Sequence, residues 1–128
     1  MIHGVGVDIV AIKRIEDALY RHGDRFLRRI LGEGEVGECA AHRTPARFLA
    51  KRFAVKEAFA KAFGSGIGAE IGWHDIAVAH HANGRPQLRF SDALQARLRQ
   101  AGCGAAHLSI SDEADYAMAY VVLEKGTT

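Results

Sequence analysis

The stretch that decides the fold is TPARFLAKRFAVKEAFAKAFG, residues 44–64, because it contains the longest helical pattern in this chain of 128 residues. Threonine is a favoured N-cap residue and proline suits the first position of a helix, so Thr44 and Pro45 mark a helix start. Glycine commonly ends helices. We therefore predict a helix from Pro45 to Phe63, with the Thr44 hydroxyl as its cap and Gly64 as its end.

The predicted helix has two unlike sides. The apolar side has helical spacing and indicates contact with a core; its members are Phe48, Val55, Phe59, Ala62 and Phe63. The opposite side mixes charged residues with alanine; its members are Arg47, Ala50, Ala54, Glu57 and Lys61. Alanines let a ligand approach the backbone and long charged side chains reach around it, so this side is a candidate binding surface. A solvated surface with an ordinary Glu57–Lys61 ion pair is an equally open interpretation.

The helix is also strongly basic. From residue 43 to residue 61 it carries six Lys or Arg and a single acid, Glu57. Arg43, Arg47 and Lys51 place like charges four residues apart, which is unfavourable in an isolated helix. We therefore expect an anionic partner that offsets this repulsion. The glycines of residues 64–68 favour a plain helix end over a phosphate-binding loop, since the chain has no P-loop or dinucleotide-binding motif.

Upstream of the helix, the pattern predicts one strand and several shorter helices. Residues 2–9 alternate small or polar residues with β-branched ones and read as a strand that ends near Asp8. Two helices follow between residues 12 and 31, and a third is indicated more weakly at 33–41 because of the glycines there. Asp8 is either a cap for the next helix or a carboxylate that meets Glu57, since Mg²⁺ favours carboxylates, waters and substrate phosphates.

Downstream of the helix, the periodicity changes from helical to alternating. Four strands are predicted, at residues 75–81, 87–90, 106–111 and 116–123. Residues 83–86 form a hairpin turn between the first two strands. A helix capped by Ser91 and ended by Gly102 separates the two pairs. This order, in which helices come first and a largely antiparallel sheet follows, is typical of an α+β fold.

Composition limits the class of protein. The length suits a single domain, which we place at residues 1–125, followed by a frayed polar tail at 126–128. The net charge is +2, but residues 1–64 carry +4 and the remainder −2, so an anionic partner should meet the first half. We expect a cytoplasmic protein without a membrane partner, since the start has no signal-peptide pattern and no stretch could span a bilayer. Cys39 and Cys103 lack the spacing of a zinc site or a disulfide framework and are expected to be buried thiols.

Three motifs together resemble one known family. They are Gly4-Val5-Gly6-Val7-Asp8-Ile9-Val10, the block from Arg47 to Gly64, and His107-Leu108-Ser109-Ile110-Ser111-Asp112. In this order, and over nearly the whole chain, the sequence resembles the holo-acyl-carrier-protein synthase family, the small bacterial type of 4′-phosphopantetheinyl transferase. The resemblance implies the α+β fold of that family. It also implies Mg²⁺-dependent transfer of phosphopantetheine from coenzyme A to a serine of an apo acyl carrier protein, with release of adenosine 3′,5′-bisphosphate, in fatty acid biosynthesis.

The resemblance implies a site as well. Asp8 and Glu57 match the family's Mg²⁺ ligands and Lys61 its phosphate-contacting lysine, which agrees with the negative charge that phosphoryl transfer develops. The residues expected to help bind coenzyme A are Arg47, Arg52, Gly64, Ser65 and His107, and the turn at Asn83, Gly84 and Pro86 matches one near the adenine. Glu57, directly or through a metal-bound water, is the preferred acceptor of the serine proton, and His107 is the second choice.

The resemblance finally implies partners. Acyl carrier proteins are acidic, and Arg14, Arg21 and Arg25, with Arg28 as a further candidate, match the family's carrier-docking surface. Family members are homotrimers with sites between subunits, and we expect the same here. The competing interpretation is a noncatalytic binding module for nucleic acid, an acidic protein or coenzyme A. Nucleic acid is disfavoured because the aromatics of the long helix lie on its predicted core side. The identity of the carrier, the tolerance for acyl-coenzyme A and the metal used in the cell stay open.

Overall fold

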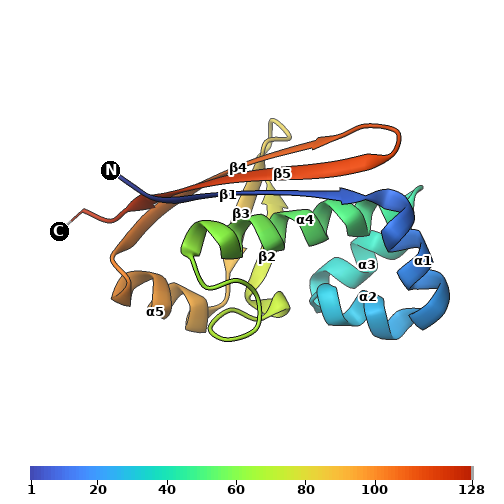
Figure 1. Ribbon diagram of the computed structural model, residues 1–128, viewed down its shortest axis with the longest axis horizontal. Helices are drawn as coiled ribbons and strands as arrows, with labels where there is room; N and C mark the ends of the chain where they lie inside the picture. The colour runs from blue at the N-terminus through green and yellow to red at the C-terminus, as the bar shows by residue number, and fades with distance from the viewer. Residues whose placement is uncertain (128) are drawn as a thin grey trace.

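The structure, a computed structural model, describes residues 1–127 as a mixed assembly of helices and antiparallel strands (Figure 1). The helices are α1 (Ile12–His22), α2 (Asp24–Ile30), α3 (Glu33–Ala41), α4 (Pro45–Phe63) and α5 (Asp92–Gln100), with a short 3₁₀ helix, η1 (Trp73–Asp75). The strands are β1 (Ile2–Ala11), β2 (Ile76–His80), β3 (Pro86–Phe90), β4 (Cys103–Asp112) and β5 (Tyr116–Lys125). The predicted α+β class and the predicted order of elements are confirmed.

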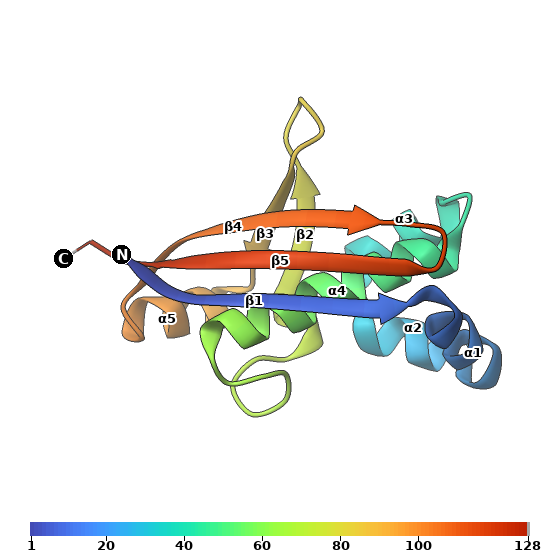
Figure 2. The same ribbon diagram turned by 45° about the horizontal axis from the view of Figure 1, so that its top comes forward.

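The strands divide into a sheet and a hairpin. β1, β5 and β4 pair in that order as an antiparallel sheet, while β2 pairs only with β3. Figure 2 shows the three long strands side by side across α4, with the hairpin projecting past β4. Helices α1, α2 and α3 gather at one end of α4, and α5 lies at the other end (Figure 1). α4 is therefore the element around which the rest of the chain is arranged.

α4 lies close against the three-stranded sheet because two glycines remove side chains at the contact. A Cβ atom at Gly4 would lie 2.1 Å from the carbonyl oxygen of Ala62, and one at Gly6 would lie 1.9 Å from that of Ala58. Real side chains are never accommodated at such distances from a backbone oxygen, so only glycine fits. The small residues of the helix thus allow β1, rather than a ligand, to approach its backbone.

The two alanines on the side of α4 that the sequence predicted to be open are buried. Ala50 and Ala54 have no exposed surface, so the prediction that they border a ligand is wrong. Arg52 and Lys56 are buried too, with 4% and 0% exposure. Glu35 of α3 meets both charges, with its Oε1 2.7 Å from Lys56 Nζ and its Oε2 3.3 Å from Arg52 Nε. The chain therefore supplies part of the anionic partner itself, so not all the basic side chains of α4 are solvated.

The predicted helix ends have mixed outcomes. Gly64 ends α4 in the left-handed region with φ 113°, and the Ser91 hydroxyl accepts a hydrogen bond from the Leu94 amide at the start of α5, both as predicted. The prediction that the Thr44 hydroxyl caps α4 is wrong. His42 is the reason, because its Nδ1 engages the Thr44 amide at 3.1 Å and the hydroxyl at 3.3 Å, which holds the hydroxyl away from the helix.

The two cysteines are free thiols, and the C-terminal end is held against the fold. Cys39 is a buried free thiol, as predicted, and Cys103 is a partly buried one. Gly126 donates its amide to the carbonyl of Gly102, so the chain stays attached beyond β5. Thr128, the last residue of the predicted tail, lies outside the described residues. Over residues 1–127, no helix combines the length and the apolar character needed to cross a membrane.

The face of the three-stranded sheet that points away from α4 is apolar and uncovered. We call it the outer face; its large apolar side chains, all at least 39% exposed, are Val5, Val7, Ile9, Tyr116, Met118 and Tyr120. The helices all lie on the opposite, inner side of the sheet (Figure 1). The alternation of exposed and buried residues along β5 is the pattern of a strand with one packed face and one free face.

Candidate active site

Three charged side chains come together where β1 passes the C-terminal half of α4. Asp8 lies two residues beyond Gly6 on β1, so strand alternation directs it toward α4. Lys61 of α4 donates hydrogen bonds from Nζ to Asp8 Oδ1 at 3.2 Å and to the Val7 carbonyl at 3.0 Å. Glu57 lies one helical turn before Lys61, and it is close enough to Asp8 for the two charges to interact. We call Asp8, Glu57 and Lys61 the carboxylate cluster.

The plainer interpretations of these residues are wrong. The N-cap of α1 is Ala11, without a side-chain hydrogen bond, so Asp8 is not a helix cap. Within residues 1–127, the ion pair of Lys61 is formed with Asp8 rather than with Glu57. The structure therefore brings together the three residues that the family resemblance singled out.

The electrostatics of the cluster suit a bound cation. Burial and the charge of Asp8 raise the pKa of Glu57 above its ordinary value, while Lys61 and Arg14 oppose this shift. The second carboxylate oxygen of Asp8, Oδ2, is buried and has no hydrogen-bond partner among the described residues. Two neighbouring carboxylates, one with an unsatisfied oxygen, form the kind of hard oxygen donor set that fits Mg²⁺.

The loop that leaves α4 adjoins this cluster along the chain. Gly64 and Ser65 follow Lys61 within one turn of the helix. The Ser65 hydroxyl donates to the Gly66 carbonyl at 2.9 Å, and a ring nitrogen of His3 contacts the Phe63 carbonyl at 3.1 Å. The start of β1 therefore packs beside the end of α4, next to Gly64 and Ser65, which the resemblance assigns to coenzyme A binding.

Arg47 lies far from the carboxylate cluster. Fourteen residues of α4 separate it from Lys61, which corresponds to about 21 Å along the helix axis. Its guanidinium donates to Asp112 Oδ2 at 2.9 Å and to the carbonyls of Glu113 at 2.7 Å and Ala114 at 3.0 Å. Arg47 therefore ties the start of α4 to the β4–β5 turn, and no single phosphate group can contact both it and Lys61.

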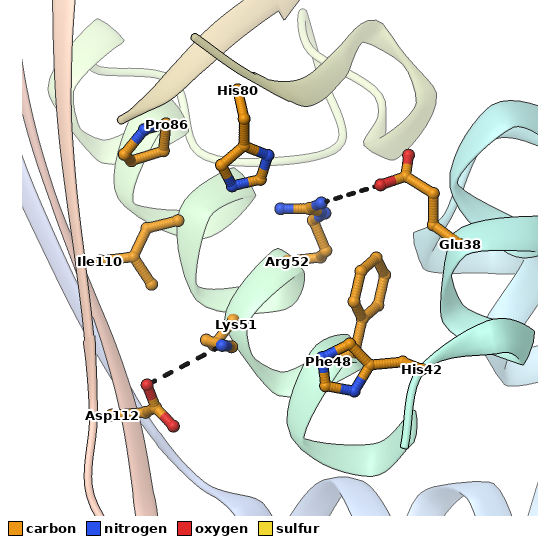
Figure 3. Close-up of a pocket in the computed structure, with 9 residues that line it drawn as sticks. All are labelled: Glu38, His42, Phe48, Lys51, Arg52, His80, Pro86, Ile110 and Asp112. Carbon is orange, nitrogen blue, oxygen red and sulfur yellow. Dashed lines mark ion pairs between the residues drawn. The ribbon is translucent and has the colours of Figure 1, made fainter. Parts of the chain in front are cut away.

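Arg52 borders a pocket of about 390 Å³ between α3, α4, the β2–β3 hairpin and β4. Figure 3 shows Arg52 pointing across this pocket toward Glu38, and Lys51 pointing toward Asp112. The ion pairs span 3.5 Å and 3.8 Å respectively. Pro86 of the predicted turn also lies in the wall. The pocket thus brings Arg52 and Pro86 together, and each of its two cations already has a carboxylate partner.

The predicted hairpin turn is confirmed and lies beside His107. Gly84 has a positive φ of 88°, and Asn83 Oδ1 accepts a hydrogen bond from the Arg85 amide at 3.0 Å. Pro86, Arg85 and His107 border a second hollow, of about 310 Å³, between β3 and β4. Pro86 of the turn that was predicted to lie near the adenine and His107, which was predicted to help bind coenzyme A, therefore border the same hollow.

The carboxylate cluster and His107 lie on opposite faces of the sheet. Asp8 pairs with Ala119 and His107 pairs with Val122 across antiparallel strands, and directly paired residues share a face. Ala119 and Val122 are an odd number of residues apart on β5, so their side chains point to opposite faces. His107 therefore cannot take the serine proton beside Glu57 of the same chain, and that second choice is wrong for a single chain.

Comparison with known sequences assigns this arrangement to a family. The profile of the 4′-phosphopantetheinyl transferase superfamily matches residues 4–121, from the glycines of β1 into β5. The chain belongs to this superfamily.

Individual relatives agree with this family over nearly the whole chain. The holo-[acyl-carrier-protein] synthase of Azoarcus sp. (strain BH72) is 52% identical over 124 residues, which cover 97% of this chain and 98% of that protein. The crystal structure of the Neisseria meningitidis holo-[acyl-carrier-protein] synthase has a TM-score of 0.94 at 43% identity, over 98% of this chain and 100% of that one. The Bacillus anthracis synthase, solved in complex with CoA (3′,5′-ADP), has a TM-score of 0.82 at 39% identity, over 98% and 99%. The predicted transferase fold is confirmed.

The predicted carrier-docking arginines form one basic surface of this transferase. Arg14 and Arg21 border a shallow groove of about 490 Å³ along α1, together with His22. Arg25 borders the neighbouring hollow of α2, which also includes His22. The charge of Arg14 further acts on Glu57. Arg14 thus connects the basic surface with the carboxylate cluster.

Several pairings in the transferase were missed because they join distant parts of the chain. Asp112 closes the motif that begins at His107, so the motif marked it, but its partner Arg47 lies 65 residues away. Glu35 belongs to a segment in which glycines obscured the helical pattern. Glu124 of β5 contacts His107 of β4, and no sequence motif marks it. Only the fold could reveal these contacts.

Proposed function

We propose that this chain is a holo-acyl-carrier-protein synthase. It transfers the 4′-phosphopantetheine arm of coenzyme A to a serine of an apo acyl carrier protein and releases adenosine 3′,5′-bisphosphate. The observation that carries this proposal is the convergence of Asp8, Glu57 and Lys61 in a member of the 4′-phosphopantetheinyl transferase superfamily. We place the reaction in the cytoplasm, where it prepares carriers for fatty acid biosynthesis.

The reaction defines what the site must supply. The serine oxygen bonds to the phosphorus that carries the pantetheine arm, and the bond from this phosphorus to the bridging oxygen of the pyrophosphate breaks. Negative charge grows on the leaving oxygen and is spread over the nonbridging oxygens. The serine proton must leave at the same time. The site therefore needs positive charge beside the phosphates and a proton acceptor beside the serine.

Lys61 supplies positive charge in a fixed place. An ammonium group has three donors, and the Val7 carbonyl and Asp8 Oδ1 engage Nζ of Lys61. Its side chain stays 50% exposed, so a donor remains for a phosphate oxygen. Gly64 and Ser65, just beyond the helix end, offer backbone amides and a hydroxyl for the same phosphates.

Asp8 and Glu57 are the residues that would hold Mg²⁺. The unpartnered, buried Oδ2 of Asp8 supports this assignment. When bound, the ion supplies charge that polarises the pyrophosphate and stabilises the leaving oxygen.

Glu57 is the proposed acceptor of the serine proton. A general base works best when its pKa lies near the operating pH. Burial and Asp8 move the pKa of Glu57 upward in this direction. A Glu57→Gln enzyme that binds Mg²⁺ and coenzyme A normally and still turns over at the wild-type rate would contradict this role.

The coenzyme A site is proposed to be shared between two copies of the chain. One chain presents the carboxylate cluster on the inner side of the sheet, and His107 with the hairpin turn on the other side. We therefore assign the two groups of one site to neighbouring subunits. The uncovered outer face supports this assembly, because exposed apolar patches of this kind mark interaction surfaces. The homotrimer implied by the family resemblance is the proposed state.

The acidic carrier is proposed to dock on the surface formed by Arg14, Arg21 and Arg25. Complementary charge mainly raises the association rate and fixes the orientation of the partner. Because Arg14 connects this surface with Glu57, a carrier bound here would present its serine to the carboxylate cluster.

Intact-mass analysis of the carrier tests the proposed function. Apo acyl carrier protein is incubated with coenzyme A, Mg²⁺ and the purified chain, and the expected product is carrier with one phosphopantetheine adduct. Asp8→Asn enzyme serves as the matched control and should form the adduct far more slowly. A folded wild-type protein that binds coenzyme A but leaves the carrier mass unchanged would favour the noncatalytic binding module instead. Repeating the assay with several carriers and with acyl-coenzyme A defines the substrate range.

A further inference from the structure

We propose that Glu124 is a positioning residue that orients His107 toward a phosphate group of coenzyme A. The inference rests on the proposed function, in which His107 is a coenzyme-binding residue. It adds a residue outside the three sequence motifs. Glu124 does not border the hollow beside the hairpin, so it acts through His107.

The contact joins neighbouring strands on the outer face. His107 of β4 pairs with Val122 of β5, and Glu124 follows Val122 by two residues, so the two side chains share a face as diagonal neighbours. Nε2 of His107 lies 2.5 Å from Oε2 of Glu124. Strand alternation therefore fixes both residues where the carboxylate can reach the ring.

The exposure of the pair argues against a purely structural role. The side chains of His107 and Glu124 are 60% and 40% exposed. Ion pairs with this much solvent contact contribute little to stability. A direct contact between two well-exposed side chains at the edge of a hollow is instead suited to fixing the orientation of one of them.

The chemistry of imidazole explains what the carboxylate does. A carboxylate accepts a hydrogen bond from one ring nitrogen and thereby sets the orientation of the ring and its proton. With Nε2 of His107 donating to Glu124, Nδ1 is the ring nitrogen that remains for a ligand. In the charged form of the ring, Nδ1 carries a proton and can donate it in a hydrogen bond to a phosphate oxygen.

The hollow beside His107 has the lining that such a ligand needs. Arg85 adds a second basic group, Pro86 and Leu88 add apolar surface, and none of the described residues that border it is acidic. A phosphate in this hollow would therefore meet positive charge and no carboxylate among the residues that line it. Glu124 is held back from the ligand by the ring that it orients.

A double-mutant cycle tests the proposal. Kinetics are measured for wild type, Glu124→Gln, His107→Gln and the double variant, with KM determined separately for coenzyme A and for the carrier. Glu124→Gln should raise KM for coenzyme A roughly 3- to 10-fold, which corresponds to the net free energy of one hydrogen bond. It should leave kcat and KM for the carrier unchanged. In the His107→Gln background the same substitution should have no further effect. Glu124→Asp, which keeps the carboxylate, should restore part of the loss, and Glu33→Gln on α3 is the control for removing an exposed carboxylate.

The outcomes separate this inference from the proposed function. Equal rises in KM with and without His107, no rise at all, or a loss of thermal stability that parallels the loss of activity would each overturn the role of Glu124. Failure of the wild-type protein to modify any carrier would instead contradict the proposed function. Calorimetry with adenosine 3′,5′-bisphosphate gives a second readout, in which Glu124→Gln should weaken binding by a similar factor.

Discussion

At the scale of single residues, the carboxylate cluster has an unbalanced charge. Lys61 pairs with Asp8, while Glu57 has its pKa raised by burial and by Asp8. The carboxyl of Glu57 therefore stabilises the metal-free fold at pH values below the ordinary pKa of glutamate. This contribution is lost as the pH rises through the raised pKa. At neutral pH the cluster consequently favours a bound cation.

Mg²⁺ should therefore raise the melting temperature of the wild-type protein at neutral pH. A ligand that binds only the folded state at 100 times its Kd contributes about 2.7 kcal/mol. Differential scanning calorimetry with Mg²⁺ and with EDTA should show this shift in wild type and a much smaller one in Asp8→Asn and Glu57→Gln. Equal shifts in all three proteins would place the metal elsewhere.

The docking surface makes a second prediction at this scale. Arg21→Glu should raise KM for the carrier about fivefold, equivalent to roughly 1 kcal/mol, and leave KM for coenzyme A unchanged. Arg14→Glu should also raise KM for the carrier more than that for coenzyme A. Arg97→Glu on α5, at the other end of α4 (Figure 1), is the matched control. A loss of carrier affinity as large in Arg97→Glu would mean that only net charge matters.

Residue roles could be predicted where a residue type and its local position were sufficient. Gly64 and Ser91 are such cases, since ending or capping a helix depends on neighbours in sequence. Thr44 failed the same reasoning because His42 competes for its hydroxyl. For Asp8 the sequence alone left two roles open, since the choice depends on how β1 lies on α4.

At the scale of elements, the contact between β1 and α4 positions the site. Gly6→Ala would place a Cβ 1.9 Å from the Ala58 carbonyl oxygen, so it should destabilise the fold by about 3 kcal/mol or more. Gly37→Ala in the middle of α3 meets no atom within 4 Å and should stabilise the protein by up to about 1 kcal/mol. Chemical denaturation measures both. A Gly6→Ala protein as stable as wild type would contradict the packing described here.

The charges buried between α3 and α4 make a second prediction for elements. Lys56 has no exposed surface and donates to Glu35 and to the Ile30 carbonyl, both at 2.7 Å. Lys56→Met should leave Glu35 without its closest cation and cost about 3–5 kcal/mol. Lys51 lies on the same helix but is partly exposed. Lys51→Met should therefore cost less than about 1 kcal/mol. Thermal unfolding measures both losses. Similar losses in the two variants would show that the buried ion pair contributes no more to stability than the partly exposed one.

The elements themselves were largely predictable, but their packing was not. Periodicity and glycine positions predicted α4, the strands and the hairpin turn near their observed limits. The same periodicity placed Ala50 and Ala54 on an open surface, because a helix covered on nearly all sides has no pattern that distinguishes a ligand from a sheet. The excess of basic residues on α4 was visible in the sequence. That Glu35 and Asp112 are the partners of these residues could be seen only in the tertiary structure.

At the scale of the whole molecule, one chain does not bring all the residues of the proposed site together. The family motifs could identify Asp8, Glu57, Lys61 and His107 as parts of one site, but only strand register shows that His107 faces away from the other three. The apolar outer face and the opposite placement of the two groups have a common explanation if copies of the chain meet at this sheet. The small size of the chain then fits a site completed by a neighbouring subunit.

Mixing of subunits tests this central claim most directly. Asp8→Asn and His107→Ala proteins are prepared separately and by co-expression, and the rate of phosphopantetheine addition to the carrier is followed by intact mass at coenzyme A concentrations below KM. Asp8→Asn alone should be nearly inactive, and His107→Ala alone should be strongly slowed at these coenzyme A concentrations because its coenzyme A site is weakened. Random co-assembly should restore about one quarter of the wild-type rate, because that share of the sites combines an intact Asp8 with an intact His107 from the neighbour. A co-expressed mixture no more active than the average of the two variants would contradict the shared site.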